Sequence, residues 1–210
     1  MKIINPKINF LEIGDINDVI NEDIIEYKEF DSIDFSSVRE ISDKIFSSCI
    51  FKKCRFDKTI FKNNDFIDVI FDNVDFSNKT FCNKLFERVI IKKSTCLGTK
   101  FNKMLFKNVQ IIDSIFKMSN FTDCSFNNSL FVNSNFSEST FFNSKTNNLQ
   151  MEKNILENVY FEENSFEELD FSSCQLNCIK SDYRSVRNIK IKPEQSVHFI
   201  SLLNIGLSEK

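Results

Sequence analysis

The sequence predicts an all-β solenoid, a chain that winds in coils and turns a corner every five residues. Three observations predict it: an apolar residue recurs at every fifth position, a small residue often stands two positions before it, and Asn often stands two positions after it. A period of five fits neither the 3.6-residue repeat of an α-helix nor the two-residue alternation of a β-strand. A chain that changes direction at regular corners fits all three observations.

The central position of each repeat is mainly phenylalanine. From Ile41 to Ile191, 31 central positions follow one another in steps of five without an insertion or deletion, and 20 of them are Phe. We expect these rings to point inward and form the core, each contributing roughly 2–3 kcal/mol on burial. They are Phe46, Phe51, Phe56, Phe61, Phe66, Phe71, Phe76, Phe81, Phe86, Phe101, Phe106, Phe116, Phe121, Phe126, Phe131, Phe136, Phe141, Phe161, Phe166 and Phe171.

The positions around each central residue have their own preferences. Small residues two positions earlier, such as Cys49, Val69 and Ser129, would let large and small side chains pack closely in a narrow interior. Asn two positions later tolerates turn conformations, so it predicts corners. These residues are Asn63, Asn73, Asn78, Asn83, Asn108, Asn128, Asn133, Asn143, Asn148, Asn158 and Asn188.

Four basic residues interrupt the pattern of small side chains: Lys44, Lys79, Lys84 and Arg184. Burying an unpaired charge is costly, so we expect local widening or a bulge at these places. The coil around Lys79–Lys84 is therefore expected to be the least regular.

The repeat, as in SSCIFKKCRF and TDCSFNNSLF, strongly resembles the pentapeptide-repeat family. The resemblance implies a right-handed quadrilateral β-helix with four pentapeptides per coil. Coils would then recur every twenty residues and stack at roughly 4.8 Å, the spacing of paired strands. Residues 41–192 would form about eight such coils.

Both ends depart from the repeat. Residues 193–210 predict a short C-terminal α-helix that begins at Pro193 and stops at Gly206. It resembles the C-terminal dimerisation helix of Qnr- and MfpA-type pentapeptide-repeat proteins, which implies a homodimer. Its apolar residues are too many for one narrow stripe, so we expect one face on the last coil and one on a second subunit. These residues are Val197, Phe199, Ile200, Leu202 and Leu203.

Residues 1–40 are expected to cap the other end. Phe30 and Phe35 are five residues apart but one residue out of phase with Ile41, so a coil would begin near Tyr27. Apolar residues at helical spacing behind Asp15, from Ile16 to Ile24, predict a short helix.

The composition argues against an enzyme. The chain has one histidine, His198, and three scattered glycines, so it cannot form a P-loop, a dinucleotide fingerprint or a Ser/His/Asp set. We expect no catalytic residue, no cofactor and no metal. The seven cysteines form no CxxC pair and are interpreted as small buried side chains in a reducing cytoplasm. No apolar run is long enough to span a membrane, and no secretory signal is evident.

Charge bears on the choice of partner. Residues 1–43 carry a net charge of −7, and residues 44–193 carry +5 with both signs interspersed. The best-known activity in the family is mimicry of duplex DNA at DNA gyrase and topoisomerase IV, which protects them from quinolones or peptide poisons. A DNA mimic should present acidic residues along the rod. The sequence therefore favours a non-catalytic protein-binding solenoid with an unknown partner, and a topoisomerase-directed mimic remains the alternative.

One outward feature is unusual. Ile50, Ile70, Ile90 and Leu130, with Gln110 between the last two, precede central residues at twenty-residue spacing. They would stack into a mostly apolar strip. Such residues are tolerated on strand surfaces. They would also suit a docking strip for the N-terminal segment or for a partner. Direct binding of nucleic acid is not expected, because the small positive charge is spread over four faces. Richness in Asn, Ile, Lys and Phe suggests a low-GC bacterial genome.

Overall fold

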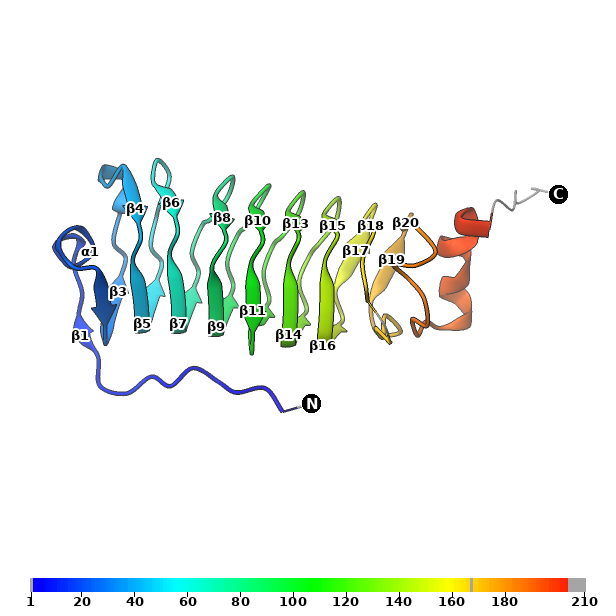
Figure 1. Ribbon diagram of the computed structural model, residues 1–210, viewed down its shortest axis with the longest axis horizontal. Coiled ribbons are helices and arrows are strands. Elements are labelled where there is room, and N and C mark those ends of the chain that lie inside the picture. Colours follow the sequence, from blue (N-terminus) through cyan, green and yellow to red (C-terminus); the bar gives the residue numbers. More distant parts are fainter. Residues whose placement is uncertain (1, 167, 204–210) are drawn as a thin grey trace.

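The computed structural model, which describes residues 2–166 and 168–203, is an elongated parallel β-helix of about eight turns (Figure 1). Strands of neighbouring coils pair in parallel at a twenty-residue register, with Phe46 beside Phe66 and Phe66 beside Phe86. The predicted fold class is confirmed. No helix among the described residues is both long and apolar enough to cross a bilayer.

The strands form two larger sheets and two isolated pairs. The ten-stranded sheet covers two adjacent faces of the coil and contains β1 (Glu12–Ile13), β2 (Ile24–Glu26), β3 (Lys28–Asp31), β5 (Ile45–Lys52), β7 (Asp65–Asp72), β9 (Leu85–Lys92), β11 (Leu105–Lys107), β12 (Gln110–Ile112), β14 (Ser125–Val132) and β16 (Lys145–Glu152). The six-stranded sheet contains β8 (Thr80–Cys82), β10 (Lys100–Asn102), β13 (Asn120–Thr122), β15 (Thr140–Phe142), β18 (Tyr160–Glu162) and β20 (Lys180–Ser181). The pairs are β4 (Glu40–Ser42) with β6 (Ile60–Lys62), and β17 (Ile155–Glu157) with β19 (Gln175–Asn177).

Left-handed backbone marks the corners. All eleven asparagines that predicted corners have a positive φ, from 46° at Asn143 to 72° at Asn148, so that prediction is confirmed. Asn is one of the few residues that adopt this conformation at low cost, because its short polar side chain bonds locally. Residues such as Lys53 and Met118 have the same conformation at equivalent corners. The coil geometry therefore imposes it even where the residue does not favour it.

The interior is filled by aromatic rings. All twenty repeat phenylalanines are buried, and none is more than 7% exposed. In one column the ring centroids of Phe101 and Phe121 are 5.0 Å apart, and those of Phe121 and Phe141 are 4.7 Å apart. Rings on adjacent faces meet edge to face, as Phe76 and Phe81 do at 5.4 Å. These offset and edge contacts are the favoured geometries of aromatic pairs.

The small polar residues also satisfy buried backbone groups. The amide of Ser94 donates to Oγ of Ser114, whose own amide donates to Oγ of Ser134. The amide of Ser134 donates in turn to Oδ1 of Asn154. Because a buried N–H must find an acceptor, these side chains complete the ladder where the backbone turns.

The N-terminal end begins the solenoid earlier than the sequence boundary at residue 41. The helix α1 (Ile16–Asn21) is present, with Asp15 as N-cap and Asp18 closing a capping box. The first coil starts at β2, close to the predicted start near Tyr27, because Ile25 already pairs with Phe46. The one-residue phase shift falls between Phe35 and Ile41, where the 3-10 helix η1 (Phe35–Ser37) turns the chain.

Gly14 is required at this end. A Cβ on Gly14 would lie 2.5 Å from the ring of Phe30, so only glycine lets the chain pass this close over the first coil.

The coil around Lys79–Lys84 is regular, contrary to expectation. β8 pairs in register with β10, and the Lys79 ammonium donates to the carbonyl of Asp57 at 2.7 Å. The Lys84 ammonium lies 3.3 Å from the Asp65 carboxylate. The long side chains leave the interior and find surface acceptors, so the backbone does not need to widen. The irregular segment is instead the turn from Tyr183 to Asn188, which contains Arg184.

The C-terminal helix is a 3-10 helix, η2 (Pro193–Leu203), and not the α-helix expected from the sequence. Its first turn is tight: the amide of Gln195 donates to the carbonyl of Lys192, three residues earlier. The buried Gln195 amide group also donates to the carbonyls of Phe171 and Cys174. This side chain therefore satisfies carbonyls of the last coil that have no following strand.

Candidate binding surface

The interior offers no chemical site, because rings and thiols fill it. Burial raises the pKa of Cys49 and Cys54 to about 11 and that of Cys124 to about 12. A thiol is nucleophilic, or binds metal, only as the thiolate, so these groups are inert at neutral pH. Among the described residues, no group of three or more His, Cys, Asp or Glu could hold a metal ion.

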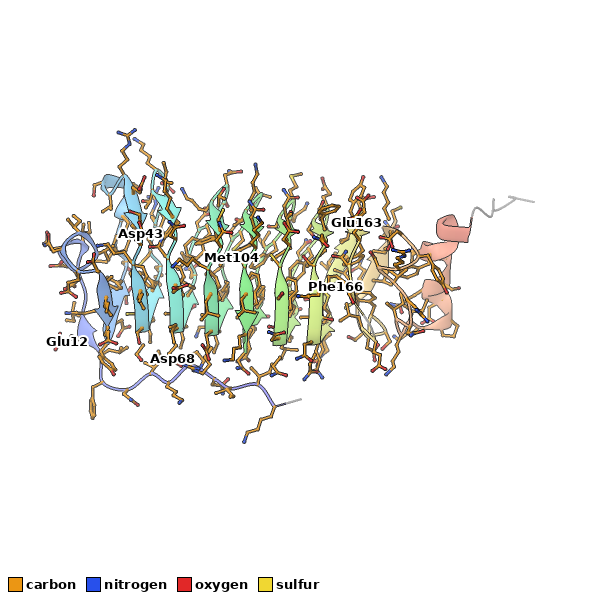
Figure 2. All side chains as sticks on the ribbon, viewed as in Figure 1. Glu12, Asp43, Asp68, Met104, Glu163 and Phe166 are labelled. Carbon is orange, nitrogen blue, oxygen red and sulfur yellow. The ribbon has the colours of Figure 1, made fainter. Side chains whose placement is uncertain are left out.

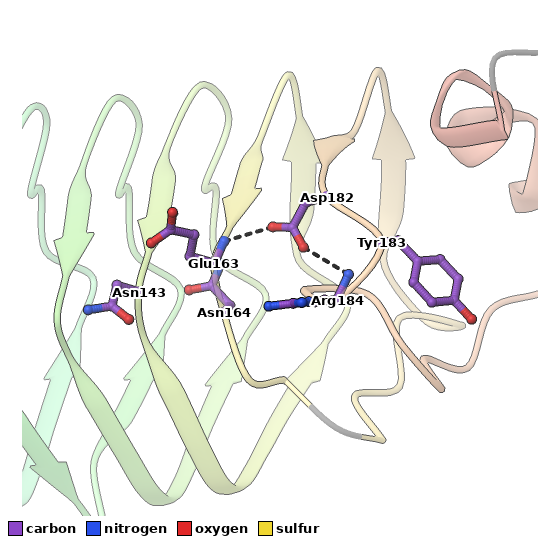
Figure 3. Close-up of a pocket in the computed structure, with 6 residues that line it drawn as sticks. All are labelled: Asn143, Glu163, Asn164, Asp182, Tyr183 and Arg184. Carbon is purple, nitrogen blue, oxygen red and sulfur yellow. Dashed lines mark hydrogen bonds between the residues drawn. The ribbon is translucent and has the colours of Figure 1, made fainter.

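The hollow at the C-terminal end is lined by polar residues (Figure 3). Asp182 is its central acid, and its carboxylate accepts from the amides of Glu163, Arg184 and Ser185 and from the Ser185 hydroxyl. Burial opposes its ionisation most strongly, but these donors together hold the pKa of Asp182 below its ordinary value. The carboxylate therefore stabilises the turn, and its oxygens are occupied by these donors, so it is not available as a general base. The other lining residues are Asn143, Asn164 and Tyr183.

Surface charges form ladders of alternating sign. Along one column of the ten-stranded sheet, Asp31, Lys52, Asp72 and Lys92 lie side by side on successive coils. The Lys92 ammonium is 3.1 Å from the Asp72 carboxylate. A second column places Arg55 between Asp34 and Asp75. Neighbouring coils therefore neutralise one another along these columns, and neither presents the single sign of a nucleic-acid backbone.

The N-terminal acidic residues are also partly neutralised. Lys28 lies 3.0 Å from Glu12 and 3.4 Å from Asp18, while Lys44 contacts Asp23 at 3.2 Å. The hydrogen bond to Glu12 is the main reason that the pKa of Lys28 lies above its ordinary value. Several carboxylates that give this end its negative charge are thus paired with cations.

The predicted apolar strip consists of Ile50, Ile70, Ile90 and Leu130, and the structure stacks it on the outer surface of the ten-stranded sheet. Ile50, Ile70 and Ile90 pair in register on successive coils, and Gln110 pairs with both Ile90 and Leu130. All five side chains are half-buried. The column therefore runs over five coils and is apolar on all of them except the coil of Gln110.

The N-terminal arm, residues 2–10, runs lengthwise along the solenoid, across successive coils (Figures 1 and 2). Asn5 Oδ1 accepts from Nε2 of Gln110 at 2.8 Å, which joins the arm to the strip. The arm otherwise contacts the corner next to the strip, through Ser48, Asp68 and Asn108. The sequence predicted a corner at Asn108, but it did not single out Ser48 or Asp68. The only signal was that Ser48, Asp68 and Arg88 replace the more usual Asn in one column.

The structure describes the side chains of only two of the five residues predicted to form the dimer interface. Phe199 packs against the core, and Val197 is 45% exposed. The side chains of Ile200, Leu202 and Leu203 lie outside the described part of the structure.

A family model described as pentapeptide repeats, with eight copies, matches residues 46–78. No curated protein matches the sequence at a significant level. Among solved structures, full-length QnrB1, a plasmid-mediated fluoroquinolone resistance protein, is 12% identical, with a TM-score of 0.37 over 87% of this chain and 99% of that chain. A trypsin-treated QnrB1 variant is 20% identical, with a TM-score of 0.41 over 88% of this chain and 90% of that one.

HetL, from the cyanobacterium Nostoc sp. strain PCC 7120, is a pentapeptide-repeat protein involved in the regulation of heterocyst differentiation. It is 9% identical, with a TM-score of 0.33 over 80% of this chain and 83% of its own. Because these identities and TM-scores are low, the three structural similarities do not indicate what this chain binds.

Proposed function

Since this chain is a pentapeptide-repeat protein, we propose that it acts as a non-catalytic protein-binding solenoid. The observation that carries the proposal is the apolar strip on the outer surface of the ten-stranded sheet. The interior is already filled by rings, so these outward side chains are not needed for the core. A mostly apolar stripe on the outer surface is typical of a protein-interaction surface.

Site-specific photo-cross-linking in cells tests the proposal. A photoreactive residue in place of Leu130 should capture one defined protein, and Ile70→Asp with Ile90→Asp should lower that capture by about tenfold or more. The matched control is Thr122→Asp, a half-buried outward position on the six-stranded sheet, which should leave capture unchanged. Equal capture in all three proteins, or none, would contradict a binding role for the strip.

The alternative is a DNA mimic that binds DNA gyrase or topoisomerase IV and relieves quinolone poisoning. The acidic residues of the first coils favour it, but the paired carboxylates and alternating ladders described above weigh against it. We expect no inhibition of gyrase supercoiling by the purified protein. Inhibition that disappears when Glu22, Asp23 and Glu26 are changed to their amides would reverse this preference.

We also propose that the chain forms a homodimer through η2. The exposed Val197 beside the core-packed Phe199 supports a helix with two apolar faces. Light scattering should give a dimer mass for the wild type and a monomer mass for Val197→Asp. Ser196→Asp, at an exposed position on the same helix, is the control. A monomeric wild type would refute this part of the proposal.

A cytoplasmic location is part of the same proposal. All seven cysteines are free, and five of them are buried. Free thiols in this number suit a reducing compartment.

A further inference from the structure

The N-terminal arm lies along the solenoid axis and crosses the coils instead of joining a sheet. Its backbone makes three hydrogen bonds to corner side chains. The amide of Lys7 donates to Oδ1 of Asp68 at 2.8 Å, and the carbonyl of Lys7 accepts from Oγ of Ser48 at 3.1 Å. The amide of Ile4 donates to Oδ1 of Asn108 at 3.3 Å. The corner residues thus recognise the main chain of the arm.

The arm corner, Ser48, Asp68, Arg88 and Asn108, differs from the other corners in burial. Ser48, Asp68 and Asn108 are 7%, 6% and 3% exposed. Equivalent corner residues on other columns, such as Asn63 and Asn83, are exposed. The arm does not contact those columns in the same way, because the hydrogen bonds of the described arm residues reach this corner and the neighbouring Gln110.

The spacing of the corner suits an extended peptide. Asp68 and Asn108 are two coils apart, which corresponds to roughly 9.6 Å at the spacing of paired strands. Lys7 and Ile4 are three residues apart, which spans roughly 10 Å in an extended chain. Acceptors on alternate coils can therefore bind amides that are three residues apart in a peptide that runs along the axis. Ile3, Pro6 and Ile8 are half-buried, so apolar side chains add to the contact.

The acceptor carboxylate of Asp68 is part of a network of ion pairs at the arm corner. Asp68 makes a two-point contact with Arg88, through Nε at 2.6 Å and Nη2 at 2.7 Å. Burial opposes ionisation of Asp68 most strongly, but Arg88 and the amide of Lys7 hold its pKa below the ordinary value. Arg88 also contacts Glu87, and Glu87 contacts Lys107. The carboxylate that accepts from the arm is therefore ionised, and the two-point contact with Arg88 holds its orientation.

We propose that the arm corner is a binding groove for an extended peptide segment, and that the N-terminal arm is its built-in occupant. The ligand is a partner segment with main-chain amides free and isoleucine- or proline-like side chains on one side. This inference rests on the proposed protein-binding function and names the kind of partner segment. A tethered arm has an effective concentration on the order of millimolar, so a partner segment must displace it.

A labelled peptide of residues 2–10, KIINPKINF, tests the groove in the full-length protein by fluorescence anisotropy. Ile3→Asp with Ile8→Asp weakens the arm and should strengthen binding of the added peptide by about tenfold or more, because the competitor is lost. The matched control, Asn9→Asp with Phe10→Asp, adds the same charge at exposed positions and should bind like the wild type. A scrambled peptide should not bind either protein.

Removing the groove side chains gives the opposite result. Ser48→Gly with Asn108→Gly, placed in the arm-weakened protein, should abolish peptide binding. Glycine accepts the φ of 53° and 55° at these positions, so the backbone is kept. Asn73→Gly with Asn83→Gly, at two other corners of φ 57°, is the control and should retain binding.

Failure of the arm-weakened protein to bind more tightly than the wild type would overturn the inference, as would equal binding by both glycine pairs. Neither result affects the proposed protein-binding function, which the cross-link at Leu130 tests independently.

Discussion

The middle coils and the C-terminal coils of the solenoid are stabilised in different ways. In the middle, aromatic columns are continuous: Phe121 lies between Phe101 and Phe141 and is fully buried. Towards the C-terminal end, Thr146 and Ser181 occupy central positions and are half-exposed. There, the Asp182 carboxylate accepts hydrogen bonds from backbone amides and the Gln195 side chain donates to backbone carbonyls, and these bonds hold the chain in place.

The difference shows that one repeat geometry can be maintained by two kinds of interaction. Apolar burial is strong and tolerates no loss of volume, because the neighbouring rings cannot collapse into a cavity. Side-chain hydrogen bonds contribute less each, and those that Asp182 accepts depend on its ionisation. The two regions should therefore respond differently to the same kind of perturbation.

The largest effect is expected in the middle. Phe121→Ala should lower the free energy of unfolding by about 3–5 kcal/mol, because it opens a cavity between two stacked rings. Thr146→Ala removes far less buried volume and should cost less than about 1 kcal/mol. Urea unfolding measures both values. Similar costs for the two variants would show that the regions do not differ in packing.

A smaller effect is expected at the end. Asp182→Ala leaves the amides of Glu163, Arg184 and Ser185 without their acceptor and should destabilise the last coil by about 1–2 kcal/mol. Hydrogen exchange should accelerate in residues 181–191 and remain unchanged around Phe121. Uniform acceleration along the chain would mean that the end does not unfold separately.

Acidification should reproduce part of this change. The pKa of Asp182 is lowered in the folded protein, so its ionised form contributes stability above the ordinary Asp pKa of about 3.9. That contribution is lost as the pH falls through the lowered value. Exchange at residues 181–191 should therefore rise below about pH 4 in the wild type, and this rise should shrink in Asp182→Asn. An identical pH profile in both proteins would assign the acid sensitivity to other groups.

The smallest effect is expected on the surface ladders. Lys92→Gln removes one partly exposed ion pair with Asp72 and should change the free energy of unfolding by no more than about 0.5 kcal/mol. High salt should remove this difference by screening. A cost above about 1 kcal/mol would mean that the alternating ladder acts as a cooperative network.

The sequence by itself determined the repeat, the inward position of each fifth residue and the corners. These features are local, because an apolar residue every five positions and a turn-tolerant residue two positions later specify the same path in each coil. The short helix behind Asp15 also followed from its cap and apolar spacing.

Only the tertiary structure decided which coil each irregular residue joins. Lys79 turns outward because the Asp57 carbonyl on the preceding coil accepts its ammonium, 22 residues away in sequence. The type of the C-terminal helix depends on its contact with the last coil through Gln195. The N-terminal arm is placed by bonds that span 61 residues to Asp68 and 104 residues to Asn108. Local pattern carries no information about such pairs, since the fold alone brings them together.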